Sequence, residues 1–384
     1  MFTTKRKYIG LDYGSHSLRA IELEEANGTL NLSRWASAPV PPGAINAVGE
    51  VTDIGLLATT LKDFFRSAKL PMKQVVTMVP SSGLVIRNIL LPQMEPEELR
   101  EAAKWEAAQY LPYPIEEATY DLVSLQPLPF YSQLPDSEVL LIAAHTPKIM
   151  ALVEACQRAG LDLVGIDAAP LAMARAIGVG EKARQERYPP RQQSSDPLGE
   201  TAAGFEVDLT TFSEAIINLG YSTTDVSIFQ NGGLRVNRSF TIGLANFDQK
   251  IMERLGVSWA EATHIRAVEA RVDVAGIIPI GEEREIQITA AVQGVAEELL
   301  EEIQRSLDYY RAQNGWIPID RVVVIGDGVK LHGLIEYLSN NLGVALEVGN
   351  PLVNLAPTDT FSPDIELYST AIGLALWGCP NDSR

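Results

Sequence analysis

The chain has 384 residues, with 31 Lys plus Arg against 49 Asp plus Glu and a net charge of -18. This length favours two domains, since a domain usually holds roughly 100–200 residues. The acidity argues against nucleic acid and anionic membrane as direct partners, because both attract basic surfaces. The two cysteines, Cys156 and Cys379, lie far apart in sequence and indicate a reducing compartment, with no disulfide framework and no zinc site.

The sequence also argues against export and membrane insertion. Residues 1–14 begin with basic residues, but Asp12 interrupts the apolar run that a signal peptide would need. No stretch of 18 apolar residues runs unbroken, so no membrane span is predicted. We expect a soluble cytoplasmic protein.

The first half of the chain alternates between predicted strands and helices, which favours α/β layers. Apolar residues share one stripe over Asp53–Lys69, which predicts an amphipathic helix. A second helix should begin near Pro96 and stop at Pro112, and Gly160 should end a third helix, Lys148–Ala159. Strands are expected at Lys7–Leu11, Leu18–Leu23, Gln74–Val79, Leu84–Leu91, Glu138–Ala144 and within 161–168.

A polar segment at 178–208 separates the two halves. It is rich in Pro, Gly and Gln without any period, so it is predicted to be a linker or a surface loop. After it the chain restarts with a strand, a polar turn and a strand over Ile217–Phe229. Helices are expected at about Phe247–Leu255 and Thr289–Gln313, and a further strand at Arg321–Ile325.

Two strand–turn–strand segments carry the same turn chemistry, "GLDYGSHSLRAIEL" in the first half and "INLGYSTTDVSIF" in the second. Each places [Asp/Asn]-x-Gly-x-x-[Ser/Thr] between apolar strands. The glycine lets the backbone approach a phosphate, while turn amides and hydroxyls donate to its oxygens. A single such turn is weak evidence, because Asp and Gly are common in turns. The repeat predicts two phosphate-binding hairpins, with candidates Asp12, Gly14, Ser15, His16, Ser17, Arg19, Asn218, Gly220, Ser222, Thr223 and Thr224.

A third segment, "VVVIGDGVKLHGL", runs from an apolar strand through a Gly-rich turn into a helix start. Adenosine or phosphate can lie there against free backbone amides, and the candidates are Gly326, Asp327, Gly328 and Lys330. The three segments resemble, in order, the phosphate-1, phosphate-2 and adenosine motifs of the actin-like ATPase fold. That resemblance implies two domains of mixed sheet plus helices that face each other across a nucleotide cleft.

A narrower resemblance covers nearly the whole chain apart from 178–208. "WEAAQYLPYP", "VVTMVPSSGLVIRNILLP", "VEACQRAGLDLVGIDAAPLAMARAI" and "YSTAIGLAL" resemble the type IV pilus assembly protein PilM family. The family resemblance implies an inserted subdomain like that of FtsA. The implied boundaries are subdomain 1A at 1–86 and 147–177, subdomain 1C at 87–146, subdomain 2A at 209–245 and 305–365, subdomain 2B at 246–304, and a C-terminal helix within 366–384 that packs back on the first domain.

The resemblance implies a scaffold of the type IV pilus machinery at the inner face of the inner membrane. It implies ATP with Mg in the cleft, with Asp12 directed at the metal. It also implies binding of the N-terminal cytoplasmic tail of a PilN-like inner-membrane protein. Further implied contacts are those with pilus motor ATPases and with other copies of the chain in an oligomer or ring. Membrane association is implied only through partners. Candidates for the peptide groove are Trp105, Gln109, Tyr110, Pro112 and Tyr113, although an aromatic residue on an amphipathic helix is more often a core residue.

The chain departs from the family pattern at four positions of the nucleotide-binding segments. One is Leu244, which follows Gly243 where a second glycine is common. Asn218 replaces the usual aspartate of the second hairpin, and Arg19 stands where lysine is usual. Asp327 replaces a glycine of the adenosine motif, and at an effective dielectric of ~20 a like charge ~6 Å from a phosphate costs a few kcal/mol. We therefore expect ATP hydrolysis to be weak or absent.

Two other functions remain open. An active ATPase or small-molecule kinase needs a metal-orienting acid and a base, and the sequence offers only Asp12 and Asp167 for these tasks. Asp167 is equally suited to capping the helix that follows it. An FtsA-like filament protein usually adds a membrane-targeting tail, whereas "LALWGCPNDSR" contains no basic amphipathic helix.

Overall fold

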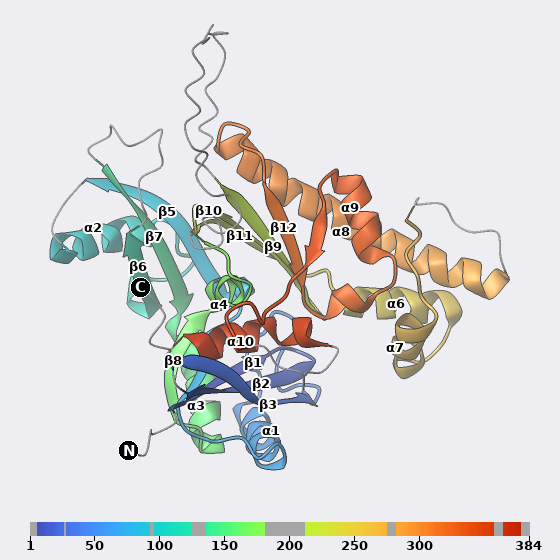
Figure 1. The fold of residues 1–384 in the computed structure, drawn as a ribbon, viewed down its shortest axis with the longest axis horizontal. Helices are drawn as coiled ribbons and strands as arrows, with labels where there is room; N and C mark the ends of the chain where they lie inside the picture. Colours follow the sequence, from blue (N-terminus) through green and yellow to red (C-terminus); the bar gives the residue numbers. More distant parts are fainter. Residues whose placement is uncertain are drawn as a thin grey trace, which may run out of the picture.

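The computed structural model contains two five-stranded sheets and one three-stranded sheet, with helices packed on all three (Figure 1). This arrangement confirms the predicted α/β class. The described residues are 6–26, 28–92, 96–124, 136–180, 212–274, 282–356 and 364–377.

The first sheet has the strand order β3-β2-β1-β4-β8. Its first three strands are antiparallel, whereas β4 and β8 continue the sheet in parallel with β1. Helices α1 (Ile54–Ser67) and α3 (Thr146–Ala159) pack against each other and against this sheet, with Leu57, Leu61 and Phe65 buried. The strands are β1 (Arg6–Tyr13), β2 (Ser17–Ala26), β3 (Thr29–Pro39), β4 (Val75–Val79) and β8 (Leu163–Ala168).

The second sheet repeats this plan, with the strand order β11-β10-β9-β12-β13. Again three antiparallel strands precede two parallel ones. Leu299, Ile303 and Leu307 of the long helix α8 lie fully inside its core. The elements are β9 (Ser213–Leu219), β10 (Thr224–Gln230), β11 (Gly233–Phe240), α6 (Leu244–Leu255), α7 (Trp259–Val268), α8 (Glu283–Gln313), β12 (Arg321–Ile325), α9 (Leu334–Leu342) and β13 (Leu346–Val348).

The third sheet is antiparallel, with the order β5-β7-β6, and carries α2 on one face (Figure 1, upper left). A mostly buried ion pair between Arg235 of β11 and Glu138 of β7 ties this sheet to the second half. The predicted subdomain boundary at 87 falls inside β5, and the subdomain boundaries stay predictions. The elements are β5 (Leu84–Pro92), α2 (Pro96–Ala108), β6 (Ala118–Ser124) and β7 (Asp136–His145).

The predicted elements agree with the structure in type, and the differences lie in length and at sheet edges. Helix α8 begins at Glu283 rather than near Thr289, because the polar residues before 289 hide its start from an apolar-period search. The sequence analysis missed β3, β6, β11 and β13, which are partly exposed strands at sheet edges. The predicted linker at 178–208 lies almost wholly outside the described residues.

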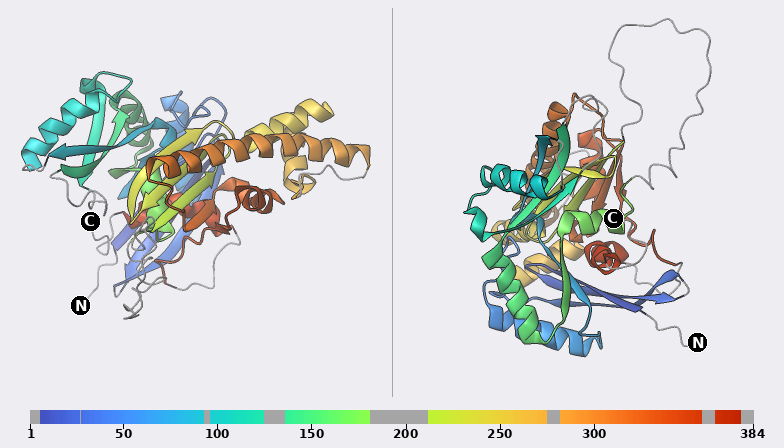
Figure 2. Two further views of the ribbon diagram at one scale, coloured as in Figure 1. Left: turned by 90° about the horizontal axis from the view of Figure 1, so that it is seen from above. Right: turned by 90° about the vertical axis from the view of Figure 1, so that its left-hand side faces the viewer.

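Helix α10 (Ser369–Leu376) lies between the two five-stranded sheets (Figure 2). It packs against α4 (Ala169–Ala176) and β1 at backbone distance. A Cβ on Gly10 would lie 1.9 Å from the carbonyl oxygen of Ala371, and a Cβ on Gly373 would lie 1.8 Å from that of Ala172. Both glycines are therefore required for α10 to pack closely against β1 and α4.

A methyl group at position 373 should destabilise the fold. We expect Gly373→Ala to lower the free energy of unfolding by about 2 kcal/mol or more, because overpacking a filled core typically costs ~1–3 kcal/mol. Gly294→Ala is the matched control, since a Cβ on Gly294 of α8 would meet no atom within 4 Å. In this control the free energy of unfolding should rise by up to about 1 kcal/mol, because Ala has a higher helix propensity than Gly. Urea unfolding measures both variants, and equal changes would contradict the packing.

Candidate functional site

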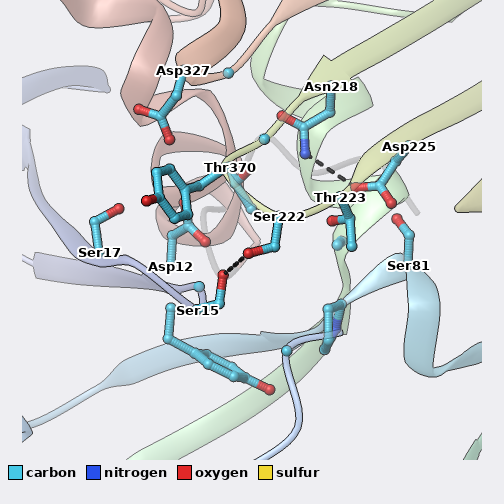
Figure 3. A pocket seen from close by; sticks show the side chains of 18 of the residues that line it. Asp12, Ser15, Ser17, Ser81, Asn218, Ser222, Thr223, Asp225, Asp327 and Thr370 are labelled. Atoms are coloured by element: carbon cyan, nitrogen blue, oxygen red, sulfur yellow. Dashed lines mark hydrogen bonds between the residues drawn. The ribbon is translucent and has the colours of Figure 1, made fainter. Parts of the chain in front are cut away.

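The ends of both hairpins and the turn after β12 line one cavity of about 110 Å³ (Figure 3). The two sheets repeat one strand plan, so equivalent turns from the two halves face each other here. The predicted residues that line the cavity are Asp12, Gly14, Ser15, His16, Ser17 and Arg19 from the first half, and Asn218, Gly220, Ser222, Thr223, Gly326 and Asp327 from the second.

Three predicted residues lie outside the cavity lining. The Thr224 hydroxyl donates to the carbonyl oxygen of Ile242 at 2.7 Å. Gly328 packs against Leu219, to which a Cβ would come within 2.5 Å. Lys330 forms ion pairs with Asp364 and Glu366, so its ammonium group is already neutralised by two carboxylates.

Both turns are closed by the same backbone hydrogen bond. The amide of Gly14 donates to the carbonyl oxygen of Ser17 at 3.0 Å, and the amide of Gly220 donates to that of Thr223 at 2.9 Å. A Cβ on Gly220 would lie 2.7 Å from that carbonyl oxygen, so this turn requires glycine. These tight turns place the Ser and Thr hydroxyls at the mouth of the cavity.

The tips of the two hairpins touch across the cavity. The hydroxyl oxygens of Ser15 and Ser222 are 2.7 Å apart and hydrogen-bonded, as Figure 3 shows. The rings of His16 and Tyr221 stack with centroids 3.8 Å apart and planes 18° apart. These contacts join the two halves through side chains only.

An ion pair also crosses from one half to the other. The Arg19 guanidinium, on β2, donates from Nη2 to Oδ1 of Asp327, in the turn after β12, at 2.5 Å. Both side chains are mostly buried, with exposed fractions of 14% and 21%. Because low solvent access strengthens a charge pair, this contact is a substantial restraint on the cleft.

The acids of the cavity are poorly solvated. Burial raises the pKa of Asp12 to about 6, while the Arg19 guanidinium lowers it and the Asp327 carboxylate raises it further. Burial also raises the pKa of Asp225, against the lowering effect of hydrogen bonds from Ser239 and Asn218. Burial therefore favours the protonated form of both carboxyl groups.

Asp225 is the main cavity residue that the sequence analysis missed. It lies opposite Asn218 in the β9–β10 pairing, as Arg19 lies opposite Asp12 in the first hairpin. Asn218 Nδ2 donates to Asp225 Oδ2 at 3.1 Å. The second hairpin thus carries its acid on the returning strand, which counting the strand register across the turn would have revealed.

The remaining walls come from elements with no recognisable motif. Met78, Ala169 and Met173 form an apolar part of the lining, from β4 and α4. Hydroxyl groups come from Ser81 and Thr370, which Figure 3 draws beside the hairpins. Only the folded chain brings these residues to the cavity.

Asp167 takes neither of its predicted roles. It does not line the cavity, and its Oδ2 accepts a hydrogen bond from Nη1 of Arg175 at 2.8 Å. Its Oδ1 accepts from the amide of Ala168, and α4 has no side-chain cap. Arg175 also donates to the carbonyl oxygen of Gly373 at 2.9 Å, so this pair fixes α4 to α10.

The predicted peptide-groove residues lie around the end of α2, away from the cavity. The Trp105 side chain is 76% exposed, which excludes the core alternative for this residue, and Tyr110 is 41% exposed. The Tyr113 ring lies 4.6 Å from the His145 ring. Gln109 donates to Glu106 at 3.1 Å, and Pro112 is exposed.

No group of three or more His, Cys, Asp or Glu side chains among the described residues is arranged to hold a metal ion. No helix in that part of the chain is long and apolar enough to cross a membrane.

A family model described as type IV pilus assembly protein PilM matches residues 10–188 and 205–379. The chain belongs to this family. A solved PilM-PilN type IV pilus biogenesis complex contains a chain 25% identical, with 97% of this chain and 98% of that chain covered and a TM-score of 0.77. The predicted resemblance to the PilM family is confirmed.

Two further solved structures are similar in fold. The ethanolamine utilization protein EutJ from Carboxydothermus hydrogenoformans is 15% identical, with 97% and 90% of the two chains covered and a TM-score of 0.53. MreB 5 of Spiroplasma citri, solved bound to AMPPNP, is 12% identical, with 97% and 96% covered and a TM-score of 0.53. Together with the PilM match they confirm the actin-like fold of this PilM family member.

The raised pKa of Asp12 predicts a pH-dependent cost to stability. The folded chain holds this proton more tightly than the unfolded chain, so its free energy of unfolding falls as pH rises from about 4 to 6. We expect Asp12→Asn to raise the free energy of unfolding by about 1–2 kcal/mol more at pH 7.5 than at pH 4.5. Urea unfolding with EDTA and no nucleotide measures this difference.

Asp63→Asn, on the exposed side of α1, controls for the general effect of losing a carboxylate. An Asp12→Asn gain that is the same at both pH values would show that Asp12 is ordinarily solvated.

Proposed function

We propose that this chain is a cytoplasmic scaffold of a type IV pilus machine. It binds the N-terminal cytoplasmic tail of a PilN-like inner-membrane protein and so links pilus motors to the envelope complex. The observation that carries this proposal is the similarity to a chain of the PilM-PilN complex over 97% of this chain and 98% of that one. The chain reaches the inner face of the inner membrane through this partner.

The exposed end of α2 is the proposed docking surface for the tail. Trp105 and Tyr110 are exposed there, and large exposed aromatic side chains are typical of binding hot spots. The Arg87 guanidinium lies 6.0 Å from the centroid of the Tyr110 ring. Gln109, Pro112 and Tyr113 complete the proposed groove.

Charge supports the same partner class. Cytoplasmic segments next to membrane spans carry an excess of Lys and Arg. A chain with a net charge of -18 attracts such a tail at long range and raises its rate of association.

In this proposal the cleft holds ATP with Mg as a structural ligand. The turn amides and the hydroxyls of Ser15, Ser222 and Thr223 would bind phosphate oxygens, and Asp12 would hold the metal through water. Hydrolysis is proposed to be weak or absent. The wall from β4 and α4 is apolar, and Asp225 and Asp327 are already engaged with Asn218 and Arg19.

The proposed contacts with pilus motors, with further copies of the chain and with the membrane rest on the family resemblance alone. Pilus motor ATPases, and further copies of the chain in an oligomer or ring, would contact surfaces outside the α2 end. Membrane association would come only through partners.

The docking surface can be tested with a fluorescent peptide of the PilN-like tail and the full chain. We expect Trp105→Ala and Tyr110→Ala each to weaken binding about tenfold or more, because truncated hot-spot side chains commonly cost ~2 kcal/mol. Fluorescence anisotropy gives the affinities.

Tyr309→Ala is the matched control, since Tyr309 is 52% exposed on α8 in the other half. It should bind as the unchanged chain does. Unchanged affinity in both α2-end variants would refute this docking surface, and no binding by the unchanged chain would refute the proposed function.

A further inference from the structure

Two charged residues of the predicted nucleotide-binding segments contact each other. Arg19 lies on β2, just after the first turn, and Asp327 lies in the turn after β12. The structure joins them by an ion pair of 2.5 Å across the two halves. A charge that would be unfavourable beside a phosphate therefore has a partner built opposite it.

Arg19 is the only Lys or Arg among the described residues that line the cavity. Four carboxylates share the lining with it, from Asp12, Asp225, Asp327 and Glu366. A phosphate-bearing ligand would find one permanent cation here, and guanidinium–phosphate pairs are among the strongest charge-assisted hydrogen bonds. That cation is already bound to the Asp327 carboxylate, whose charge has the same sign as that of a phosphate group and whose two oxygens can also accept hydrogen bonds from a guanidinium.

The size of the cavity also limits which ligands can enter it. Its volume of about 110 Å³ is below the ~300–1,000 Å³ typical of clefts that hold small ligands. A nucleotide would therefore have to move the two halves apart at the cavity, where the Ser15–Ser222 hydrogen bond joins the hairpin tips and the Arg19–Asp327 ion pair joins β2 to the turn after β12. Breaking this pair both widens the cleft and frees the guanidinium.

We infer that Asp327 competes with phosphate for Arg19 and thereby sets how tightly the cleft holds phosphate-bearing ligands. This inference rests on the proposed binding of nucleotide in the cleft. Asp327 thus weakens the binding of phosphate-bearing ligands by occupying Arg19, and it needs no contact with the ligand to do so. Removing its charge should strengthen binding of ADP and ATP, and should leave adenosine, which carries no phosphate, unaffected.

The test uses the full chain and four variants with fluorescent ADP and ATP, and adenosine as a competitor. Asp327→Asn should bind the nucleotides about tenfold more tightly, since one competing charge contact is removed. Arg19→Ala should bind ADP and ATP about as weakly as adenosine. The double variant Arg19→Ala with Asp327→Asn should not show the tighter nucleotide binding of Asp327→Asn, because that effect depends on Arg19. Asp63→Asn controls for net charge.

Three outcomes would overturn the inference. One is nucleotide affinity in Asp327→Asn that is unchanged or weaker. Another is a gain that persists without Arg19, which would indicate a general charge effect. The third is an absence of nucleotide binding in the unchanged chain and in every variant.

Binding of the PilN-like tail peptide is measured on the same samples. If the peptide binds and no variant binds nucleotide, this inference fails and the scaffold stands. If the peptide does not bind, the proposed function fails, and the nucleotide series still decides the role of Asp327.

Discussion

One apolar cluster around α4 and α10 holds the two halves of this protein together. It includes Ile21 of the first sheet, Ile216 and Ile325 of the second, and Ile372 of α10, all 0–1% exposed. Because this cluster combines residues of both sheets with α4 and α10, it joins the halves at this end. Beyond the cluster, at the hairpin tips, they meet only through polar and aromatic side chains. The cleft is therefore the edge at which a ligand can separate them.

The repeated strand order determines what that edge can do. Equivalent turns face each other, so each half supplies one glycine turn and its hydroxyls. The charges are not equivalent, since Asp12 faces Arg19 across its hairpin whereas Asn218 faces Asp225. The described lining of the cavity is rich in carboxylates and includes one guanidinium, that of Arg19, which pairs with Asp327 across the two halves. This arrangement agrees with the proposal that nucleotide orders the shape of the protein for its partner.

Local sequence was enough to predict the glycine turns, because a tight turn and its flanking apolar strands are encoded within about ten residues. It was also enough for α1 and β12, whose apolar periods are strong. The sequence analysis missed Asp225, which counting the strand register across its turn would have revealed. It also missed the edge strands β3, β6, β11 and β13, because their burial is only partial. The contact between Arg19 and Asp327 joins residues 308 positions apart, so only the assembled fold brings it about.

In our proposal the cleft holds nucleotide without hydrolysing it while the α2 end binds a partner. The decisive measurement is phosphate release from ATP with Mg, made with the full chain and the PilN-like tail peptide together. We expect a bound peptide and a release rate no higher than that of Asp12→Ala. Steady release well above that variant would contradict the proposal.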